Sequence, residues 1–234
     1  MWGKWIDCTV PVASREQFGF GQRAWAAIGD AEGLVGQVGG WDRETGRAKL
    51  LGLWSGSESY GRFMRERHDE VFALSGQRGS FTAIDTAAGE TVLDVAGEMA
   101  DLPGALEGLE GAELLRVADC RVLPGRTGHF IDVQRRVWGR GMAAAGGMRA
   151  GVVTRLAPDR YLVTTLWSGR AAHDRYRTER FPALRTRAGL PDDLRSTTGH
   201  LIPLERDWCV VAAARLRPVA EASAAPARAG ADVG

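Results

Sequence analysis

The sequence predicts an α+β protein in which two tandem ferredoxin-like (βαββαβ) repeats form a dimeric α/β barrel within one chain. An internal repeat is the main observation: residues 4–10 read KWIDCTV, and residues 116–122 read RVADCRV. Residues 53–56 and 166–169 both read LWSG. The offset is about 112 positions between Asp7 and Asp119 and about 113 between Trp54 and Trp167. Because the register is nearly constant, the two copies are expected to have the same structure.

The first copy reads as strand, helix, strand, strand, helix, strand. Ile6, Cys8 and Val10 alternate with polar or aromatic neighbours, as in a strand with one buried face. Helical spacing of apolar residues follows at two places, and turn residues separate the segments. The predicted elements are a strand at 5–10, a helix at 14–28, strands at 34–38 and 49–54, a helix at 57–74, and short strands at 81–86 and 91–95.

The second copy repeats this order. We expect Pro182 to disturb the last turn of its second helix, because proline lacks the backbone N–H. The predicted elements are a strand at 116–122, a helix at 128–137, strands at 151–156 and 161–167, a helix at 170–184, and closing strands at 200–204 and 208–216.

These elements divide the chain into two units. We predict a first unit at 1–97, a linker at 98–113, a second unit at 114–217 and a disordered tail at 218–234, where Ala, Pro, Gly and Arg show no periodicity. A ferredoxin-like sheet has helices on one face only. Two such sheets in one chain can cover their bare faces by packing against each other, which predicts the barrel.

Composition limits the classes of function. The 234 residues are 44% hydrophobic and 25% charged, with a net charge of +1, so no bulk field attracts nucleic acid or an acidic membrane. The chain has no apolar run of roughly 20 residues and no basic-plus-apolar leader, so we predict a cytoplasmic protein, monomeric or homodimeric. Three cysteines without CxxC spacing predict neither a disulfide framework nor a zinc site. No motif predicts a cofactor.

The LWSG blocks with the helix starts that follow them resemble the antibiotic-biosynthesis-monooxygenase superfamily. A closer resemblance, over most of residues 4–209, is to the YdbC-like bacterial proteins. The matching blocks are residues 36–42 (GQVGGWD), 68–72 (HDEVF), 75–78 (SGQR), 118–122 (ADCRV), 129–130 (HF), 137–138 (VW) and 181–184 (FPAL). The resemblance implies the barrel fold and a ligand site between helices and sheet. The superfamily contains cofactor-free oxygenases, haem-degrading enzymes and members without a catalytic role.

The haem-degrading branch places an iron-binding histidine about nine residues after the strand tryptophan. This chain has Phe63 and Tyr176 at those positions. Tyrosine can bind haem iron, but the absence of histidine there makes haem the least favoured of three functional hypotheses.

Asp7 and Asp119 occupy equivalent places in otherwise apolar strands. Each is a candidate acid or base with its pKa raised by burial, or a salt-bridged strand residue, with Arg116 or Arg121 as a partner of Asp119. Trp54 and Trp167 could stack on a planar substrate or anchor the core.

Trp41 follows Gly39-Gly40, where the backbone can approach closely, and is a candidate for a cleft edge. His68, beside Asp69, is a candidate base or a surface residue paired with a carboxylate. His173 aligns with Tyr60 on an apolar stripe, so we predict that burial lowers its pKa. His129 opens a helix and is assigned to substrate binding.

The predicted function is a small-molecule enzyme, either a cofactor-independent monooxygenase or an acid–base tailoring enzyme of secondary metabolism. Its substrate would be planar and aromatic or polyketide-like. The catalytic candidates are Asp119, His173, Asp7 and His68, and the substrate-binding candidates are Trp167, Tyr176, Trp54, Trp41 and His129. The alternatives are a non-enzymatic ligand-binding or stress-associated module, and a haem-binding or haem-degrading protein. The second copy is favoured as the working cleft because it has more groups able to transfer protons.

Overall fold

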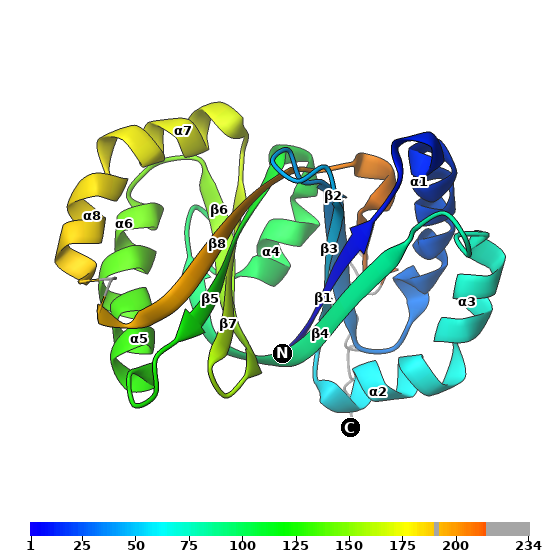
Figure 1. Cartoon of the computed structure of the whole chain (residues 1–234), viewed down its shortest axis with the longest axis horizontal. Helices are drawn as coiled ribbons and strands as arrows, with labels where there is room; N and C mark the ends of the chain where they lie inside the picture. The colour runs from blue at the N-terminus through cyan, green and yellow to red at the C-terminus, as the bar shows by residue number, and fades with distance from the viewer. Residues whose placement is uncertain (190–191, 214–234) are drawn as a thin grey trace, which may run out of the picture.

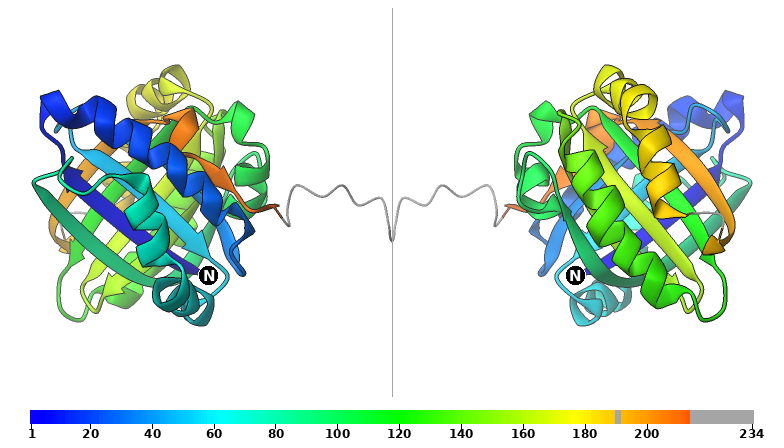
Figure 2. Two further views of the ribbon diagram at one scale, coloured as in Figure 1. Left: turned by 90° about the vertical axis from the view of Figure 1, so that its right-hand side faces the viewer. Right: turned by 90° about the vertical axis from the view of Figure 1, so that its left-hand side faces the viewer.

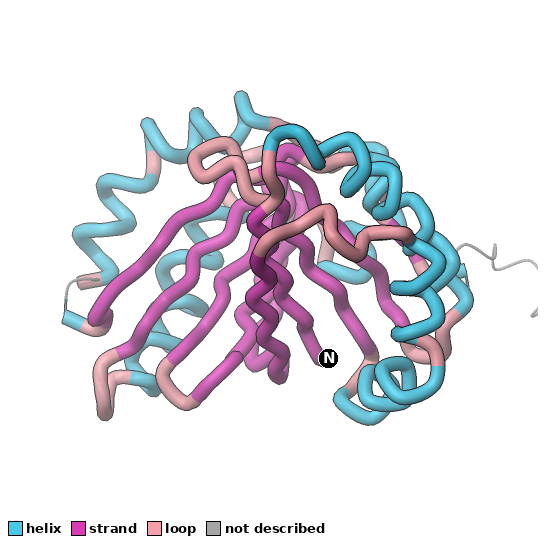
Figure 3. Tube along the Cα trace, turned by 45° about the vertical axis from the view of Figure 1, so that its right-hand side comes forward, coloured by secondary structure: helices cyan, strands magenta, loops and turns pink. Residues whose placement is uncertain are grey.

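A curled antiparallel sheet forms the centre of the protein, with helices on its outer side (Figures 1 and 3). The computed structural model describes residues 1–189 and 192–213; the predicted tail at 218–234 lies outside them. The nine strands have the order β8-β5-β7-β6-β4-β1-β3-β2-β9. The first half contains β1 (Trp2–Thr9), α1 (Arg15–Ala24), β2 (Leu34–Trp41), β3 (Ala48–Trp54), α2 (Ser57–Glu66), α3 (His68–Ser75) and β4 (Ala83–Ala96).

The second half follows after α4 (Leu102–Glu107), which lies between the halves in Figure 1. Its elements are β5 (Leu114–Val122), α5 (Thr127–Val133), a π-helical stretch (Gln134–Gly139), α6 (Arg140–Ala143), β6 (Met148–Ala157), β7 (Arg160–Trp167), α7 (Arg170–Glu179), α8 (Phe181–Ala188), β8 (Leu194–Pro203) and β9 (Val210–Val211).

The two halves have equivalent strand orders, β4-β1-β3-β2 and β8-β5-β7-β6. They are joined by antiparallel pairing of β4 with β6, from Glu90 opposite Arg155 to Ala96 opposite Ala150. Each half therefore has the ferredoxin-like arrangement, and the predicted α+β barrel is confirmed. Figure 2 shows that the helices of each half cover the sheet of that half.

On the other side of the barrel, β2 and its following turn lie against β8. The Arg43 N–H donates to the Leu201 carbonyl (3.2 Å), and the Glu205 N–H donates to the Gly39 carbonyl (2.9 Å). A Cβ atom at Gly40 would lie 2.0 Å from the Pro203 carbonyl oxygen. The close backbone approach expected at Gly39-Gly40 is thus present, at the junction of the two halves.

Several predicted element boundaries were wrong. The helix predicted at 57–74 breaks at Arg67 into α2 and α3, and the one at 170–184 breaks at Arg180 into α7 and α8. Pro182 stands in the first turn of α8, where a missing N–H has no cost, so it helps start a helix instead of disturbing one. The helix predicted at 14–28 ends at Ala24 and continues as a 3₁₀ turn.

Two strand predictions also need correction. The short strands at 81–86 and 91–95 are parts of one continuous strand, β4, with a register shift between Thr91 and Leu93. Within the described residues, the strand predicted at 208–216 is the two-residue β9. It pairs with β2 of the first half, through Val210 opposite Gln37 and Val211 opposite Gly36.

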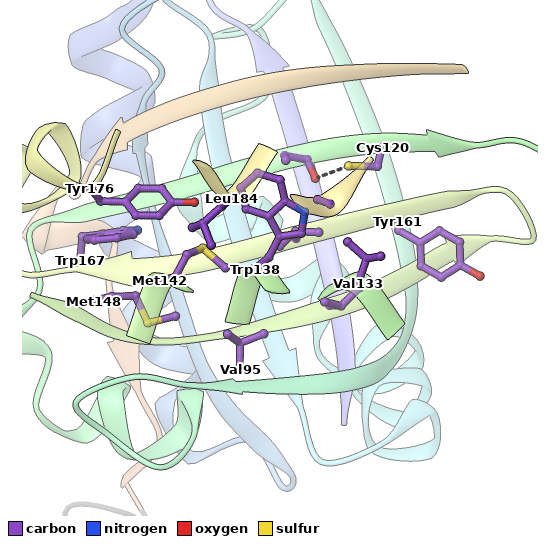
Figure 4. Close-up of a cluster of buried hydrophobic side chains, with 14 of the residues drawn as sticks. Val95, Cys120, Val133, Trp138, Met142, Met148, Tyr161, Trp167, Tyr176 and Leu184 are labelled. Carbon is purple, nitrogen blue, oxygen red and sulfur yellow. Dashed lines mark hydrogen bonds between the residues drawn. The ribbon is translucent and has the colours of Figure 1, made fainter. Parts of the chain in front are cut away.

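Buried side chains form three layers of apolar packing. One cluster fills the barrel interior between the halves and includes Trp5, Leu51, Val117 and Leu162. A second lies between the sheet and the helices of the second half (Figure 4), and two smaller ones lie under the helices of the first half. Any helix–sheet cleft is therefore separated from the barrel interior by the sheet itself.

Candidate functional site: two helix–sheet clefts

The alternation of strand side chains decides which candidate residues can meet. On β5, Val117 packs in the barrel interior, whereas Ala118 and Cys120 pack under the helices. Asp119 therefore faces the interior. On β1, Trp5 is interior and Cys8 lies under the helices, so Asp7 also faces the interior.

Both aspartates form ion pairs there. The Lys49 Nζ lies 2.6 Å from Asp7 Oδ2, and the Arg47 Nε lies 2.5 Å from Asp7 Oδ1. Arg160 donates three hydrogen bonds to Asp119, the shortest one 2.6 Å from Nη2 to Oδ2. Arg160 is thus the partner of Asp119 in place of Arg121 or Arg116.

These charges belong to one cluster. The hydrogen bond to Asp119 raises the pKa of Arg160, and the charges of Asp85 and Asp7 raise it further. Asp85 lies directly opposite Asp7 on β4. The structure therefore brings Arg160, the partner of Asp119, within electrostatic range of Asp7 and Asp85, and it does not bring Asp119 to Trp167 and His173.

We define the first cleft as the space between the sheet and α1, α2 and α3. It contains a cavity of about 330 Å³ with largely apolar walls. The wall residues include Ile6, Cys8, Phe18, Trp25, Leu50, Phe72 and Phe81, and the exposed Ile84 and Thr86 of β4 lie at its margin. A side pocket of about 40 Å³ extends toward Trp54, Tyr60 and Phe63.

Polar side chains also line this space, and three of them have hydrogen-bonding atoms of interest. His68 lines both cavities of the first cleft, and its Nδ1 lies 2.9 Å from Asp69 Oδ1. Lys4 also lines both; its Nζ lies 5.3 Å from the Tyr60 ring centroid and has no acidic partner among the described residues. Gln22 is 5% exposed, and its Oε1 is buried without a hydrogen-bond partner.

The two tryptophans predicted near this cleft lie in different places. Trp54 is buried and stacks on Phe63, with ring centroids 4.8 Å apart, so it forms a wall of the side pocket. Trp41 packs against Trp208 (5.1 Å) and under the Arg15 guanidinium (4.8 Å). It borders an open groove of about 590 Å³ on the far side of α1.

The equivalent space in the second half, the second cleft, is filled by its own side chains (Figure 4). A cavity of about 80 Å³ remains beside Arg116, Gln134 and Trp138. Trp167 is fully buried, and its Nε1 donates to Thr165 Oγ1 over 2.9 Å. The residues that fill the space include Val133, Trp138, Met142, Trp167, Tyr176 and Leu184.

His173 and Tyr176 lie together against Trp167, with ring centroids 5.3 and 5.1 Å from it. Burial, as expected from the sequence, and the Arg116 charge together lower the pKa of His173 to about 4. Burial raises the pKa of Tyr176 to about 12. At neutral pH both side chains are therefore uncharged.

His129 lies outside both clefts. Its Nδ1 is 2.6 Å from Asp193 Oδ2, and the buried Asp193 also pairs with Arg126. His200 is paired with Asp42 across the junction of the halves (2.9 Å).

Two pairs of cleft residues were missed by the sequence analysis as functional candidates. Lys4 and Arg116 occupy the same place in the repeat and give each cleft one cation. Gln22 and Gln134 likewise correspond and give each cleft a buried amide. The repeat alignment contained this signal, since both pairs are offset by 112 positions.

In residues 1–189 and 192–213, no three His, Cys, Asp or Glu side chains are grouped so that they could hold a metal ion. No helix in that part of the chain is long and apolar enough to cross a membrane.

The fold and the clefts define a single-chain dimeric α/β barrel. Solved structures share it at low sequence identity. A candidate monooxygenase from Lactobacillus acidophilus NCFM matches with a TM-score of 0.68 and 12% identity, over 90% of this chain and 95% of that one. An anthrone oxidase-like protein matches with a TM-score of 0.62 and 15% identity, over 92% and 94% of the two chains. At such identities the likeness shows the fold alone.

The sequence comparisons are more specific. The profile of the family described as "Domain of unknown function (DUF4937)" matches residues 3–88. The chain is also similar to the uncharacterized protein YdbC of Bacillus subtilis (strain 168), with 29% identity over 90 residues, which are 37% of this chain and 76% of that protein. The resemblance to YdbC is thus confirmed over about 90 residues of the chain, and the barrel fold is shared with the solved structures.

Proposed function

We propose that the protein is a small-molecule enzyme of the cofactor-independent monooxygenase or acid–base type, and that its reaction chamber is the first cleft. The observation that carries the proposal is the cavity of about 330 Å³ between sheet and helices, with aromatic walls and His68 on its lining. Its size is typical of small-molecule sites, and its walls suit a planar aromatic or polyketide-like substrate.

His68 is the proposed base. If its Nδ1–H donates to Asp69, the Nε2 lone pair is free to accept a proton, on a ring that lines the cavity. In the monooxygenase reaction His68 would remove a proton from a hydroxyl or activated C–H group, and the resulting substrate anion would reduce dioxygen. Lys4 would stabilise the negative charge that develops on the substrate, because no carboxylate of the described residues pairs with the Lys4 ammonium group.

The sequence asymmetry favoured the second copy, and that assignment stays a prediction. The first cleft is preferred because its cavity of about 330 Å³ lies between helices and sheet, whereas Trp138, Met142 and Tyr176 leave about 80 Å³ there in the second half and the larger recess of about 320 Å³ lies at the junction of the halves. Burial also makes His173 a weak base, with a pKa of about 4.

The residues do not fit haem. Phe63, at the position of the iron-binding histidine, stacks on Trp54. Tyr176 is 3% exposed, and burial raises its pKa to about 12, which opposes the phenolate needed for iron binding. Haemin titration followed in the Soret region checks this; saturable binding at one haem per chain, lost in Tyr176→Phe, would reverse the conclusion.

The experiment for the proposed function is a screen of planar phenols and anthrone-like compounds for dioxygen consumption and for binding. We expect His68→Gln to lower turnover by about 10²- to 10⁴-fold with little change in binding. His129→Gln is the matched control, since His129 is also paired with a carboxylate but lies outside the clefts. Binding without turnover would favour the ligand-binding alternative, and turnover that is lost in His173→Gln but kept in His68→Gln would favour the second copy.

A further inference from the structure

A recess of about 320 Å³ lies where α7 meets β5, β8 and the turn after β2. It shares Arg116 and Phe181 with the small cavity of the second cleft. Both halves of the chain contribute to it: Glu44 comes from the first half, and Arg116 and His173 come from the second. We call it the junction recess.

Arg116 is the main polar group of the junction recess. It is half-buried on β5 and has no acidic partner within the described residues. Of the other strand arginines in the second half, four have one: Arg121 pairs with Asp159, Arg149 with Glu98, Arg155 with Glu90 and Arg160 with Asp119, whereas Arg195, unpaired in the part of the chain that the structure describes, is exposed to solvent. A partly desolvated guanidinium without an anion is unfavourable, and its fork of N–H groups suits a carboxylate.

His173 supplies a second unsatisfied group. The residue is 5% exposed, and its Nδ1 is buried without a hydrogen-bond partner. The nearest carboxylate oxygen, Asp174 Oδ1, is 3.8 Å away, which is too far for a hydrogen bond. Since Nδ1 is closed to solvent, the ring atom available to a ligand in the recess is Nε2, which makes no hydrogen bond within the described residues.

The remaining lining restricts the shape and charge of an occupant. Tyr176, Phe181 and Leu201 form apolar walls that suit an aromatic ring. Glu44 and Arg177 are exposed lining residues of opposite charge, so Arg116 supplies the net charge that an occupant meets, and Glu44 can accept a hydrogen bond.

We propose that the junction recess binds a small aromatic monocarboxylate with a hydroxyl or amino group. Arg116 binds the carboxylate, His173 hydrogen-bonds to it, and Glu44 accepts from the donor at the other end of the ring. The site is separate from the first cleft and does not depend on the function proposed for that cleft. Since Glu44 belongs to the first half, the ligand also connects the two halves beside the hydrogen bond from Arg43 to Leu201.

The test uses 4-hydroxybenzoate and its neutral analogue 4-hydroxybenzamide, measured by calorimetry on the full chain and by the ¹⁵N shifts of the His173 ring. We expect saturable 1:1 binding of the carboxylate, at least about tenfold tighter than the amide, with a shift of the His173 signals. Arg116→Gln should weaken binding by about tenfold or more, and Arg116→Lys, which keeps the charge, by less.

Arg121→Gln is the matched control, because Arg121 lies on the same strand as Arg116 and faces the opposite side of the sheet. This substitution should leave binding unchanged. Circular dichroism shows whether each variant is folded. If Arg116→Gln does not fold, the weaker binding expected of Arg116→Lys is the measurement that tests the proposal. The proposal is overturned by equal affinity for acid and amide, by no saturable binding up to millimolar concentration, or by binding that is lost in Lys4→Gln and kept in Arg116→Gln.

Discussion

At the scale of single residues, the burial of His173 should make stability depend on pH. Its pKa is about 4 in the folded protein and 6.5 in an accessible histidine, so protonation favours the unfolded chain. The part of the free energy of unfolding that depends on neutral His173 is fully present above pH 6.5. It is lost as the pH falls toward 4, and the total loss is roughly 3 kcal/mol. Urea unfolding at pH 7 and pH 4.5 measures it. His173→Gln should lose less free energy of unfolding over this interval than the wild type; equal losses would contradict the prediction.

The two interior aspartates should differ in their effect on stability. Asp7→Asn leaves Lys49, whose side chain is 2% exposed, without its carboxylate, and should lower the free energy of unfolding by about 3–5 kcal/mol. Asp119→Asn leaves Arg160, which is 25% exposed, and should cost about 1 kcal/mol. Both variants should bind ligands of the first cleft normally, because the aspartates face the barrel interior. Loss of turnover in a stably folded Asp119→Asn would restore its catalytic assignment.

The residue scale also shows where sequence reasoning reached its limit. The repeat correctly aligned Asp7 with Asp119, and helical spacing correctly placed His173 and Tyr176 near Trp167. Alternation alone does not tell which face of a strand is turned toward the helices. Asp119 lies on the other face of the sheet from His173, because Val117 of the same strand packs inside the barrel. That packing is part of the tertiary structure.

At the scale of elements, the junction of β2 with β8 should depend on glycine. A Cβ atom at position 40 would overlap the Pro203 carbonyl oxygen at 2.0 Å, so Gly40→Ala must push the strands apart and should cost about 1–3 kcal/mol or more. Gly52→Ala is the control, because the nearest atom to its Cβ would lie 3.8 Å away. Thermal unfolding of both variants measures the difference; equal melting temperatures would show that the junction adapts freely.

Element order could be predicted from the sequence, and element ends could not. Apolar periodicity and the repeat are local signals, and they identified both βαββαβ units. The break at Arg180 was masked because the apolar stripe continues across it, and Pro182 is compatible with either a disturbed helix end or a new start. β9 forms where the chain returns to the edge of β2 and pairs with it. Residues 210–211 by themselves do not predict this long-range contact.

At the scale of the whole molecule, the two halves share one interior. Trp5, Val38 and Leu53 of the first half pack in the same cluster as Val117 and Leu162 of the second. The halves are also joined by the β4–β6 ladder and by the His200–Asp42 hydrogen bond. A single ferredoxin-like unit leaves one face of its sheet bare, and here each half covers the bare face of the other. Among the described residues, the first half has no element of its own that covers this face.

The isolated first half, residues 1–97, should therefore not be a stable monomer. Without the second half, the interior faces of β1, β2 and β3 are exposed, and the free segment of β4 lacks β6 as its partner. Since β6 is the counterpart of β2, two copies of the fragment can pair β4 with β2 and rebuild a barrel. We expect light scattering to show a dimer or larger assembly whose unfolding midpoint rises with concentration, whereas unfolding of the full chain should not change with concentration. A monomeric fragment that unfolds cooperatively would mean that each half is an independent domain and that the shared interior contributes little to its stability.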